Sequence, residues 1–359
     1  MENYVLRSAL THTKKAIAGK KLTIGFLGGS ITQSRVPHNW GDPFIHLLTN
    51  AFRDLTVVSE NVAIGATGSD LGFIRLERDI LEKDCDLVFI EYAVNDMGTP
   101  TKDRMGAMEG IIRKLLTANG GCDVILVYTY CQDMYEDLMR GTEPPVIAEY
   151  EQLADHYRIS SCWPGKYAFE CLKNGMIRFE EWLPDGLHPQ YRGSELYARC
   201  VWQLFGAALE KEGCIPALPH ALNPAWSWEN AVSIPVRSLA VTHPFYIKRC
   251  STDAFVDYVA CTSAVGAELD IDFTGTGCVL VFDFGRLSCE FEYSVDGGPV
   301  TRSDRDRPAW CGDRGWLRPY VIADDLPPAA HRLHMRIIHG NTPDHKGTNF
   351  ELTNILVLR

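Results

Sequence analysis

Ser30 is the residue of this chain best placed to act as a nucleophile. It follows the apolar run 22–27 and two glycines, Gly28 and Gly29. An apolar run that breaks into glycine and a hydroxyl predicts a strand followed by a sharp turn. Such a turn would hold the serine at the carboxyl edge of a parallel sheet. Gly-Gly-Ser is also common in ordinary loops, so a solvated turn is the alternative from this segment alone.

A serine hydroxyl is a weak nucleophile until a base removes its proton. The sequence offers one compact candidate, because Asp185 and His188 lie three residues apart in the segment Pro-Asp-Gly-Leu-His-Pro. This spacing allows Asp185 to accept the Nδ1 proton of His188, which leaves Nε2 to face Ser30. In isolation the same pattern also suits an aspartate that caps a helix beside a solvated histidine.

Two further loops could donate hydrogen bonds to a developing oxyanion. Asn95 follows the apolar run 87–92, where it is either a turn residue or an amide donor. The small-residue loop 61–70 is suited to presenting backbone N–H groups. A phosphate cradle is the competing interpretation of Gly65-x-x-Gly68, but this loop lacks the Gly-Lys-Ser/Thr sequence of such sites.

The elements that must position these loops follow an alternating pattern. From Lys21 to about Leu209, short apolar runs alternate with amphipathic stretches, which predicts βαβ units and a parallel sheet. Because the apolar runs are continuous, helices are expected on both faces of the sheet. The predicted strands are 22–27, 55–58, 87–92 and 124–128, and the predicted helices are 44–52, 74–81, 108–116, 146–157 and 194–209.

The C-terminal part has a different texture. Prolines and tryptophans cluster after residue 215, which indicates a linker or strap. Alternating runs such as 268–273 and 290–295 then predict strands, and Asp296-Gly297-Gly298 predicts a hairpin turn. A small antiparallel sandwich of the jelly-roll kind fits this pattern. The predicted domains are 1–215, the linker 216–231, and 232–359.

The composition argues against some classes of binding partner and some cellular locations. With 35 basic and 46 acidic side chains the formal net charge is −11, which argues against nucleic acid. No segment approaches about 18 consecutive apolar residues, and the first ten residues lack the apolar stretch of a signal peptide. We therefore expect a cytoplasmic protein without membrane insertion. The 12 cysteines are scattered and form no Cys-x-x-Cys pair, which favours reduced, buried thiols over disulfides or a zinc site.

Taken together, four loops after predicted strands supply a serine, backbone donors, an asparagine and an Asp/His pair, in that order. This combination resembles the SGNH hydrolases, also called GDSL esterases and lipases, over about residues 21–209. The matching blocks are Gly28–Thr32, Gly65–Gly68, Val94–Asp96 and Asp185–Pro189. The resemblance implies a flavodoxin-like three-layer α/β domain that transfers acyl groups and needs neither a metal nor an organic cofactor.

The resemblance also implies a role for each matched residue. Ser30 would be the nucleophile, His188 the general base and Asp185 its partner. The oxyanion hole would combine the Ser30 backbone N–H, an N–H of the second block and the Asn95 side chain.

Two positions depart from the family pattern. Gly29 stands where many members carry aspartate, so any structural work of that carboxylate must be done otherwise or not at all. Ala66 falls where the family usually has its oxyanion glycine, and its backbone N–H can serve if φ stays negative. Gly65 and Gly68 remain alternatives for this donor.

The substrate class rests on weaker signals, because one fold serves many esters. The aromatic residues between Tyr130 and Trp182, the latter included, either stack on sugar rings or pack a loop onto its own domain. Trp40 either lines the same pocket or anchors a helix. The pairing with a jelly roll resembles esterases that deacetylate plant polysaccharides, which implies short-chain, acetyl esters of carbohydrates and a small-molecule or oligosaccharide substrate.

Two other functions stay open as alternatives. One is an acylhydrolase acting on lipid esters, and the other is a non-catalytic carbohydrate-binding protein on a hydrolase fold. The second domain would be a sugar-binding module, part of the active-site rim, or a surface for homo-oligomers.

Overall fold

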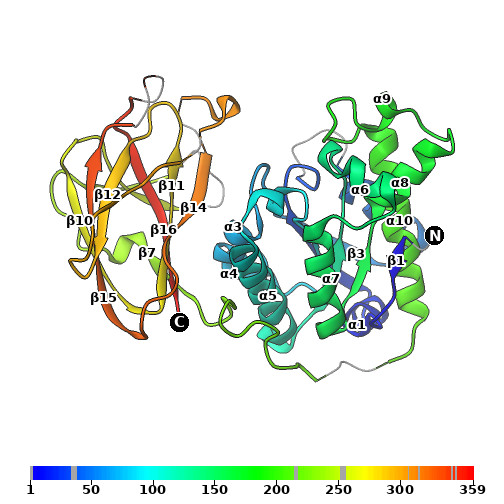
Figure 1. Ribbon diagram of the computed structural model, residues 1–359. Helices are drawn as coiled ribbons and strands as arrows, with labels where there is room; N and C mark the ends of the chain where they lie inside the picture. The colour runs from blue at the N-terminus through cyan, green and yellow to red at the C-terminus, as the bar shows by residue number, and fades with distance from the viewer. Residues whose placement is uncertain are drawn as a thin grey trace. The chain divides into compact units, whose positions relative to one another are not determined.

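A computed structural model describes residues 3–33, 39–213, 217–250, 256–305, 307–313, 316–340, 343 and 346–359. The chain divides into two compact units, Met1–Glu229 and Asn230–Arg359. Figure 1 shows that the first unit mixes helices and strands, whereas the second is built from strands.

The N-terminal unit contains a six-stranded sheet in the order β1-β6-β5-β4-β2-β3. β2 to β6 run parallel, and β1 pairs antiparallel with β6. The order reverses at β2, so loops at the carboxyl ends of β2 and β4 can meet in one crevice. The predicted flavodoxin-like parallel sheet is confirmed. The strands are β1 (Tyr4–Val5), β2 (Lys21–Gly28), β3 (Thr56–Asn61), β4 (Leu87–Glu91), β5 (Asp123–Val127) and β6 (Ser160–Cys162).

Helices cover both faces of this sheet (Figure 1). One group packs α2 (Gly41–Ala51) and α8 (Pro164–Lys173) against α10 (Tyr191–Glu210), and the other packs α3 (Ser69–Ile74) and α7 (Pro145–Tyr157) against α5 (Thr101–Thr117). The shorter helices are α1 (Thr11–Ala18), α4 (Leu76–Asp79), α6 (Tyr135–Arg140) and α9 (Phe179–Trp182).

The helix predicted over 74–81 is interrupted: α3 ends at Ile74, the chain breaks at Arg75, and α4 covers only Leu76–Asp79. Arg75 is buried, and its guanidinium donates to the backbone oxygen of Val62 (2.6 Å) and to Asp79 (2.9 Å). The side chain therefore ties the end of α3 to the loop after β3. Local periodicity cannot report such a tertiary hydrogen bond.

Residues 217–229 pack along α5. The Trp228 N–H donates to Gly106 O (3.2 Å), and Arg113 binds both Pro219 O (2.7 Å) and the Glu229 carboxylate (2.6 Å). Most of the segment expected to link the domains therefore lies on the N-terminal unit.

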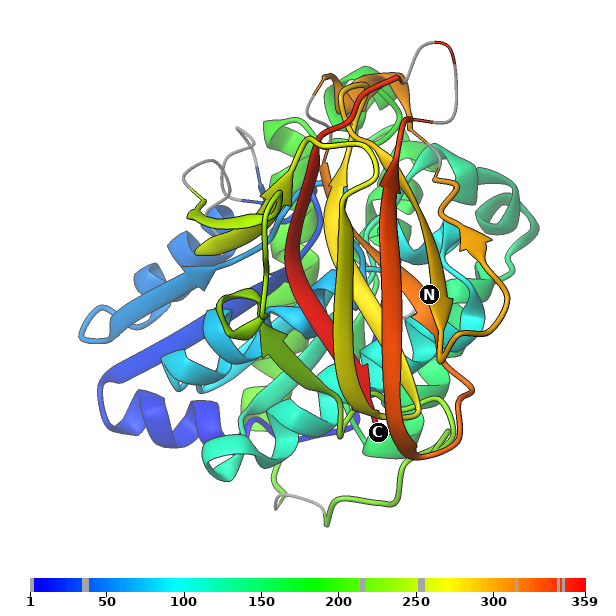
Figure 2. The same cartoon turned by 90° about the vertical axis from the view of Figure 1, so that its left-hand side faces the viewer.

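The C-terminal unit consists of two antiparallel sheets, so the predicted all-β sandwich is confirmed. Figure 2 shows its long strands running side by side. Asp296 (φ 53°) and Gly297 (φ 70°) form the predicted hairpin turn after β12. A core of phenylalanines and aliphatic residues fills the unit, including Phe282, Phe291 and Phe350. One sheet has the order β10 (Glu268–Gly275), β15 (Ala329–Ile338), β12 (Glu290–Val295), β13 (Thr301–Arg302); the other has β14 (Trp316–Ala323), β11 (Gly277–Phe284), β16 (Phe350–Leu358), β9 (Tyr258–Thr262), β8 (Tyr246–Arg249), with β7 (Val232–Pro235) also paired to β16.

Candidate active site

Ser30 lies on a tight turn directly after β2. The N–H groups of Thr32 (3.2 Å) and Gln33 (3.0 Å) both donate to the backbone oxygen of Gly29. Gly28 must be a glycine here, because an added Cβ would lie 2.8 Å from the backbone oxygen of Glu91. The strand and turn thus present the serine hydroxyl at the carboxyl edge of the sheet, as its sequence context predicts.

The structure brings His188 and Asp185 to Ser30. His188 Nε2 lies 2.8 Å from Ser30 Oγ, and His188 Nδ1 lies 2.7 Å from Asp185 Oδ2. A carboxylate can only accept a hydrogen bond, so Nδ1 carries the proton and Nε2 is left to accept from the serine hydroxyl. This tautomer is the one that a general base for Ser30 requires.

The other oxygen of Asp185 organises the loop. Asp185 Oδ1 accepts the backbone N–H groups of Leu187 (2.9 Å) and His188 (2.7 Å). Burial alone would raise the pKa of Asp185, but the hydrogen bonds from His188 and Leu187 outweigh it and lower the pKa. The Asp185 carboxylate therefore stays ionised at pH values below the usual pKa of an aspartate. Its side chain is 53% exposed.

Asn95 opens the 3₁₀ turn η2 (Asn95–Gly98) after β4, and its side chain lies over Gly29. An added Cβ on Gly29 would fall 2.0 Å from Asn95 Oδ1 and 2.8 Å from Asn95 Cγ. The amide therefore occupies the space that a side chain at position 29 would need. This contact explains why glycine, and not aspartate, precedes the serine in this chain.

The second block corrects one expectation. Ala66 has φ 57°, in the left-handed region, so the negative φ on which its role as a donor depended is not present. Gly65 lies against the nucleophile, since an added Cβ there would be 3.3 Å from Ser30 Cβ. The Gly65 N–H donates to the side chain of Gln33 (3.0 Å), so it is already engaged. This hydrogen bond joins the loop to Gln33, which ends the nucleophile turn.

The sequence motifs predict no role for two carboxylates that are buried in the structure, Asp96 and Glu91. Asp96 is fully buried, and it accepts the Ser69 N–H (3.0 Å) and the hydroxyl of Tyr150. An added Cβ on Gly68 would lie 2.2 Å from Asp96 Oδ1, so a glycine at position 68 lets the Asp96 carboxylate approach the backbone closely. Glu91 ends β4 and is also fully buried. An acidic residue that interrupts a buried apolar strand is the signal that could have identified it.

The two predicted substrate-binding tryptophans are buried, which corrects that expectation. Trp40 is 0% exposed, and its indole N–H donates to Thr32 Oγ1 (2.9 Å). Trp182 is also 0% exposed; it stacks on Tyr130 and donates to the Tyr197 hydroxyl (3.2 Å). Their aromatic faces are covered by other core side chains, so neither can stack on a substrate in this structure.

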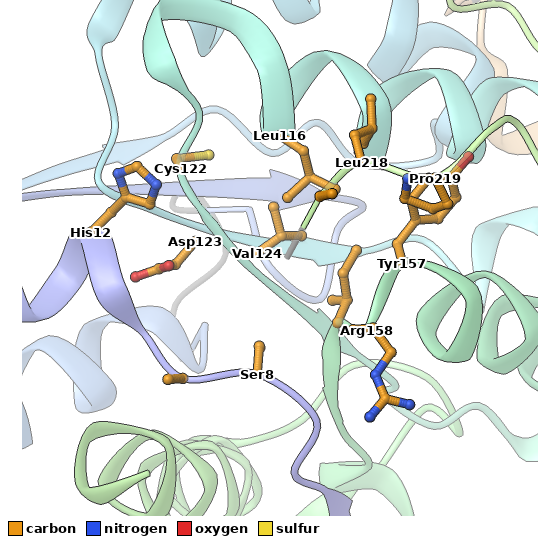
Figure 3. Close-up of a pocket in the computed structure, with 13 residues that line it drawn as sticks. Ser8, His12, Leu116, Cys122, Asp123, Val124, Tyr157, Arg158, Leu218 and Pro219 are labelled. Atoms are coloured by element: carbon orange, nitrogen blue, oxygen red, sulfur yellow. The ribbon is translucent and has the colours of Figure 1, made fainter. Parts of the chain in front are cut away.

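A separate cavity of about 130 Å³ lies at the amino end of β5, away from the loops that carry Ser30. Figure 3 shows Asp123, Ser8 and His12 among its lining residues. The Asp123 carboxylate accepts both the N–H and the hydroxyl of Thr13 (2.8 Å each), so its charge serves to fix α1.

Within the ranges that the structure describes, no group of His, Cys, Asp and Glu side chains is arranged to hold a metal ion. Among the described helices, none has the length and apolar character that crossing a membrane requires.

Comparison with known proteins agrees with the geometry. Residues 26–196 match the GDSL-like Lipase/Acylhydrolase family. The N-terminal unit therefore belongs to the SGNH hydrolases, a superfamily of carboxylic ester hydrolases. No curated protein is significantly similar to the sequence.

Solved structures resemble the chain over both units. A two-domain esterase (CEX) active on acetylated mannans, co-crystallised with mannopentaose, is 23% identical with a TM-score of 0.84; 99% of this chain and 96% of that chain are covered. A second structure of such an esterase gives 23% identity, a TM-score of 0.83, and coverages of 99% and 97%. Axe2, an acetylxylan esterase from Geobacillus stearothermophilus, is 19% identical with a TM-score of 0.43, covering 53% of this chain and 95% of that chain. The first two likenesses establish a shared two-domain fold.

Proposed function

We propose that this protein is a serine esterase that removes short acyl groups, acetyl above all, from carbohydrate esters. The observation that carries the proposal is the chain of two short contacts, Ser30 Oγ to His188 Nε2 (2.8 Å) and His188 Nδ1 to Asp185 Oδ2 (2.7 Å). A hydroxyl, a neutral imidazole and an ionised carboxylate in this order form the arrangement of a serine hydrolase triad.

The reaction would proceed by acyl transfer. Ser30 Oγ forms a bond to the ester carbonyl carbon while His188 Nε2 takes the hydroxyl proton, and the carbonyl oxygen becomes an oxyanion. The C–O bond to the sugar then breaks, and His188 returns the proton to the departing alcohol. Water, deprotonated by His188, attacks the acyl-enzyme, releases the carboxylic acid and restores Ser30.

The oxyanion would be stabilised by donors next to the serine. The Asn95 amide lies against the nucleophile turn, where it supports the role of a side-chain donor. The Ser30 N–H is the backbone donor that we propose. The N–H of Ala66 does not meet the condition of a negative φ. Gly65 is the weaker choice, because its N–H donates to Gln33.

The substrate class follows from two considerations. The whole chain shares its two-domain fold with an esterase active on acetylated mannans. The negative formal charge, −11, also suits a neutral substrate better than an anionic polymer or lipid surface. We therefore place acetylated manno-oligosaccharides first among candidate substrates, and long-chain lipid esters last.

Two measurements test this function. A serine-directed fluorophosphonate should label the protein, and peptide mapping should find the label on Ser30 and nowhere else. Ser30→Ala and His188→Ala should abolish release of acetate from an acetylated manno-oligosaccharide. His12→Ala serves as the matched control, since His12 lines the cavity at the other end of the sheet. Absence of labelling at Ser30, with binding of the sugar retained, would show a carbohydrate-binding protein and refute the esterase.

Acyl preference needs its own comparison. Acetyl nitrophenyl esters should turn over faster than octanoyl esters. The reverse chain-length profile would favour the lipid acylhydrolase.

A further inference from the structure

Glu91 is a carboxylate in a place where packing alone would not select one. It ends β4, whose five residues are all buried, and its own side chain is 0% exposed. Removing a carboxylate from water is unfavourable unless hydrogen bonds replace its hydration. Burial accordingly raises the pKa of Glu91 to about 7, against the opposing effect of its hydrogen bonds to Thr129, Thr32 and Gly29.

Those hydrogen bonds converge on the nucleophile turn. Glu91 accepts the N–H of Gly29, the residue before Ser30, and the hydroxyl of Thr32 (2.9 Å), two residues after it. The Thr129 hydroxyl, from the loop after β5, lies 2.8 Å from the other carboxylate oxygen. One side chain therefore holds the turn on both sides of the serine and joins it to a second loop.

The Thr32 hydroxyl makes two hydrogen bonds, one with Trp40 and one with Glu91. The indole N–H of Trp40 can only donate, and it lies 2.9 Å from Thr32 Oγ1. Thr32 Oγ1 therefore accepts from Trp40. Its own hydrogen goes to Glu91, because an ionised carboxylate can only accept. This chain, from indole to hydroxyl to carboxylate, leaves the turn one arrangement of donors and acceptors.

Glu91 supplies beside Gly29 a carboxylate that the turn itself does not carry. A side chain at position 29 would collide with Asn95, so the turn cannot carry its own carboxylate there. β4 pairs in parallel with β2, and Glu91 is the register partner of Gly28. The neighbouring strand thus brings a carboxylate to the turn.

We propose that Glu91 is a positioning residue for the reaction, which holds the Ser30 turn at the distance from His188 and Asn95 that acyl transfer requires. The inference rests on the esterase function proposed above. Glu91 touches neither the serine hydroxyl nor the substrate; it acts through Gly29 and Thr32.

The test compares Glu91→Ala, Glu91→Gln and Thr32→Val with a matched carboxylate elsewhere in the sheet. Asp123 is that control, because it also binds a backbone N–H and a threonine hydroxyl, but at the amino end of β5. For each variant, kcat and KM with nitrophenyl acetate, the rate of fluorophosphonate labelling of Ser30 and the thermal midpoint should be measured.

Glu91→Ala should lower kcat and the labelling rate by about 100-fold, the effect expected when a reacting group is misplaced by about 1 Å, with KM almost unchanged. Glu91→Gln should recover most of this loss, because its amide can accept from Gly29 and Thr32 and donate to Thr129. Thr32→Val, which keeps the side-chain shape, should lower both rates even if Glu91→Ala fails to fold. Asp123→Asn should lower the thermal midpoint without lowering kcat.

Normal kcat and labelling in a folded Glu91→Ala or in Thr32→Val would overturn the proposal. A Glu91→Gln enzyme as slow as Glu91→Ala would overturn it too, because charge and not position would then be the requirement. If the unaltered protein neither labels at Ser30 nor hydrolyses esters, the proposed function fails first.

Discussion

Adding one methyl group before the nucleophile should disable this site without unfolding the protein. In Gly29→Ala, the new Cβ would fall 2.0 Å from Asn95 Oδ1. A carbon and an oxygen in contact need about 3.3 Å, so the amide must move by about 1.3 Å. The Asn95 side chain is only half-buried, and it can swing away at little cost to folding. It then leaves the position that a donor to the oxyanion must hold.

The size of the effect follows from the loss of one preorganised donor. Catalytic groups must be held within about 0.5 Å of their productive positions, so a shift of about 1.3 Å removes the contribution of the amide. One oxyanion donor is worth about 2.7 to 4 kcal/mol in the barrier, or about 10²- to 10³-fold in kcat. The KM should change little, because the donor acts mainly on the transition state.

Steady-state kinetics on four variants would test this reasoning. Three of them are Gly29→Ala, Asn95→Ala and the double variant. The control is Gly98→Ala, which lies in the same turn as Asn95 and whose added Cβ would have no atom within 4 Å. Because both single changes act on one donor, the double variant should be no slower than Asn95→Ala. The reasoning is refuted if Gly29→Ala keeps normal kcat, or if the losses of the two singles multiply in the double.

Three further predictions concern the surrounding groups. Asp185→Asn should lower kcat by up to about 10⁴-fold, since the histidine loses the partner that sets its tautomer; kinetics on folded protein measure this. Burial raises the pKa values of Glu91 and Asp96 to about 7. Between about pH 4.5 and 7 the folded state then binds more protons than the unfolded chain. The free energy of unfolding should therefore fall as the pH rises through this range, and it should fall less steeply in Glu91→Gln. Urea unfolding at several pH values measures this dependence. Ala66→Gly should leave the free energy of unfolding unchanged or raise it by up to about 1 kcal/mol, because the left-handed φ costs alanine roughly 1 to 2 kcal/mol and glycine entropy offsets part of the gain. A clear loss of stability would contradict that backbone conformation.

Much of the fold could be predicted because its signals are local. Continuous apolar runs indicated β2, β4 and β5, and the structure places these strands within one or two residues of the predicted limits. The short strand β6 (Ser160–Cys162) was missed, since it carries two serines and offers no apolar run. Its place in the sheet comes from pairing with β5 and β1, which lie far away in the sequence.

The candidate site divides in the same way. Ser30, Asn95 and the Asp185/His188 pair could be identified because each stands next to an element boundary in a recognisable order. The expectation that these residues meet came from the topology of a parallel sheet. The distances between them are known only from the three-dimensional structure. Trp40 shows what the sequence could not predict. An aromatic residue near a nucleophile can line a pocket or pack in the core, and the side chains that cover it decide which.

The sequence by itself determined the order of strands, loops and reactive side chains, because strand formation and turn chemistry depend mostly on neighbouring residues. Tertiary structure alone decided which groups are buried and which hydrogen bonds they make. The bond between Thr32 and Glu91 joins residues 59 positions apart, and the one between Gly65 and Gln33 joins residues 32 apart. Such contacts form only when the sheet brings separate loops to one edge, and so the support beneath Ser30 could not be read from the residues beside it.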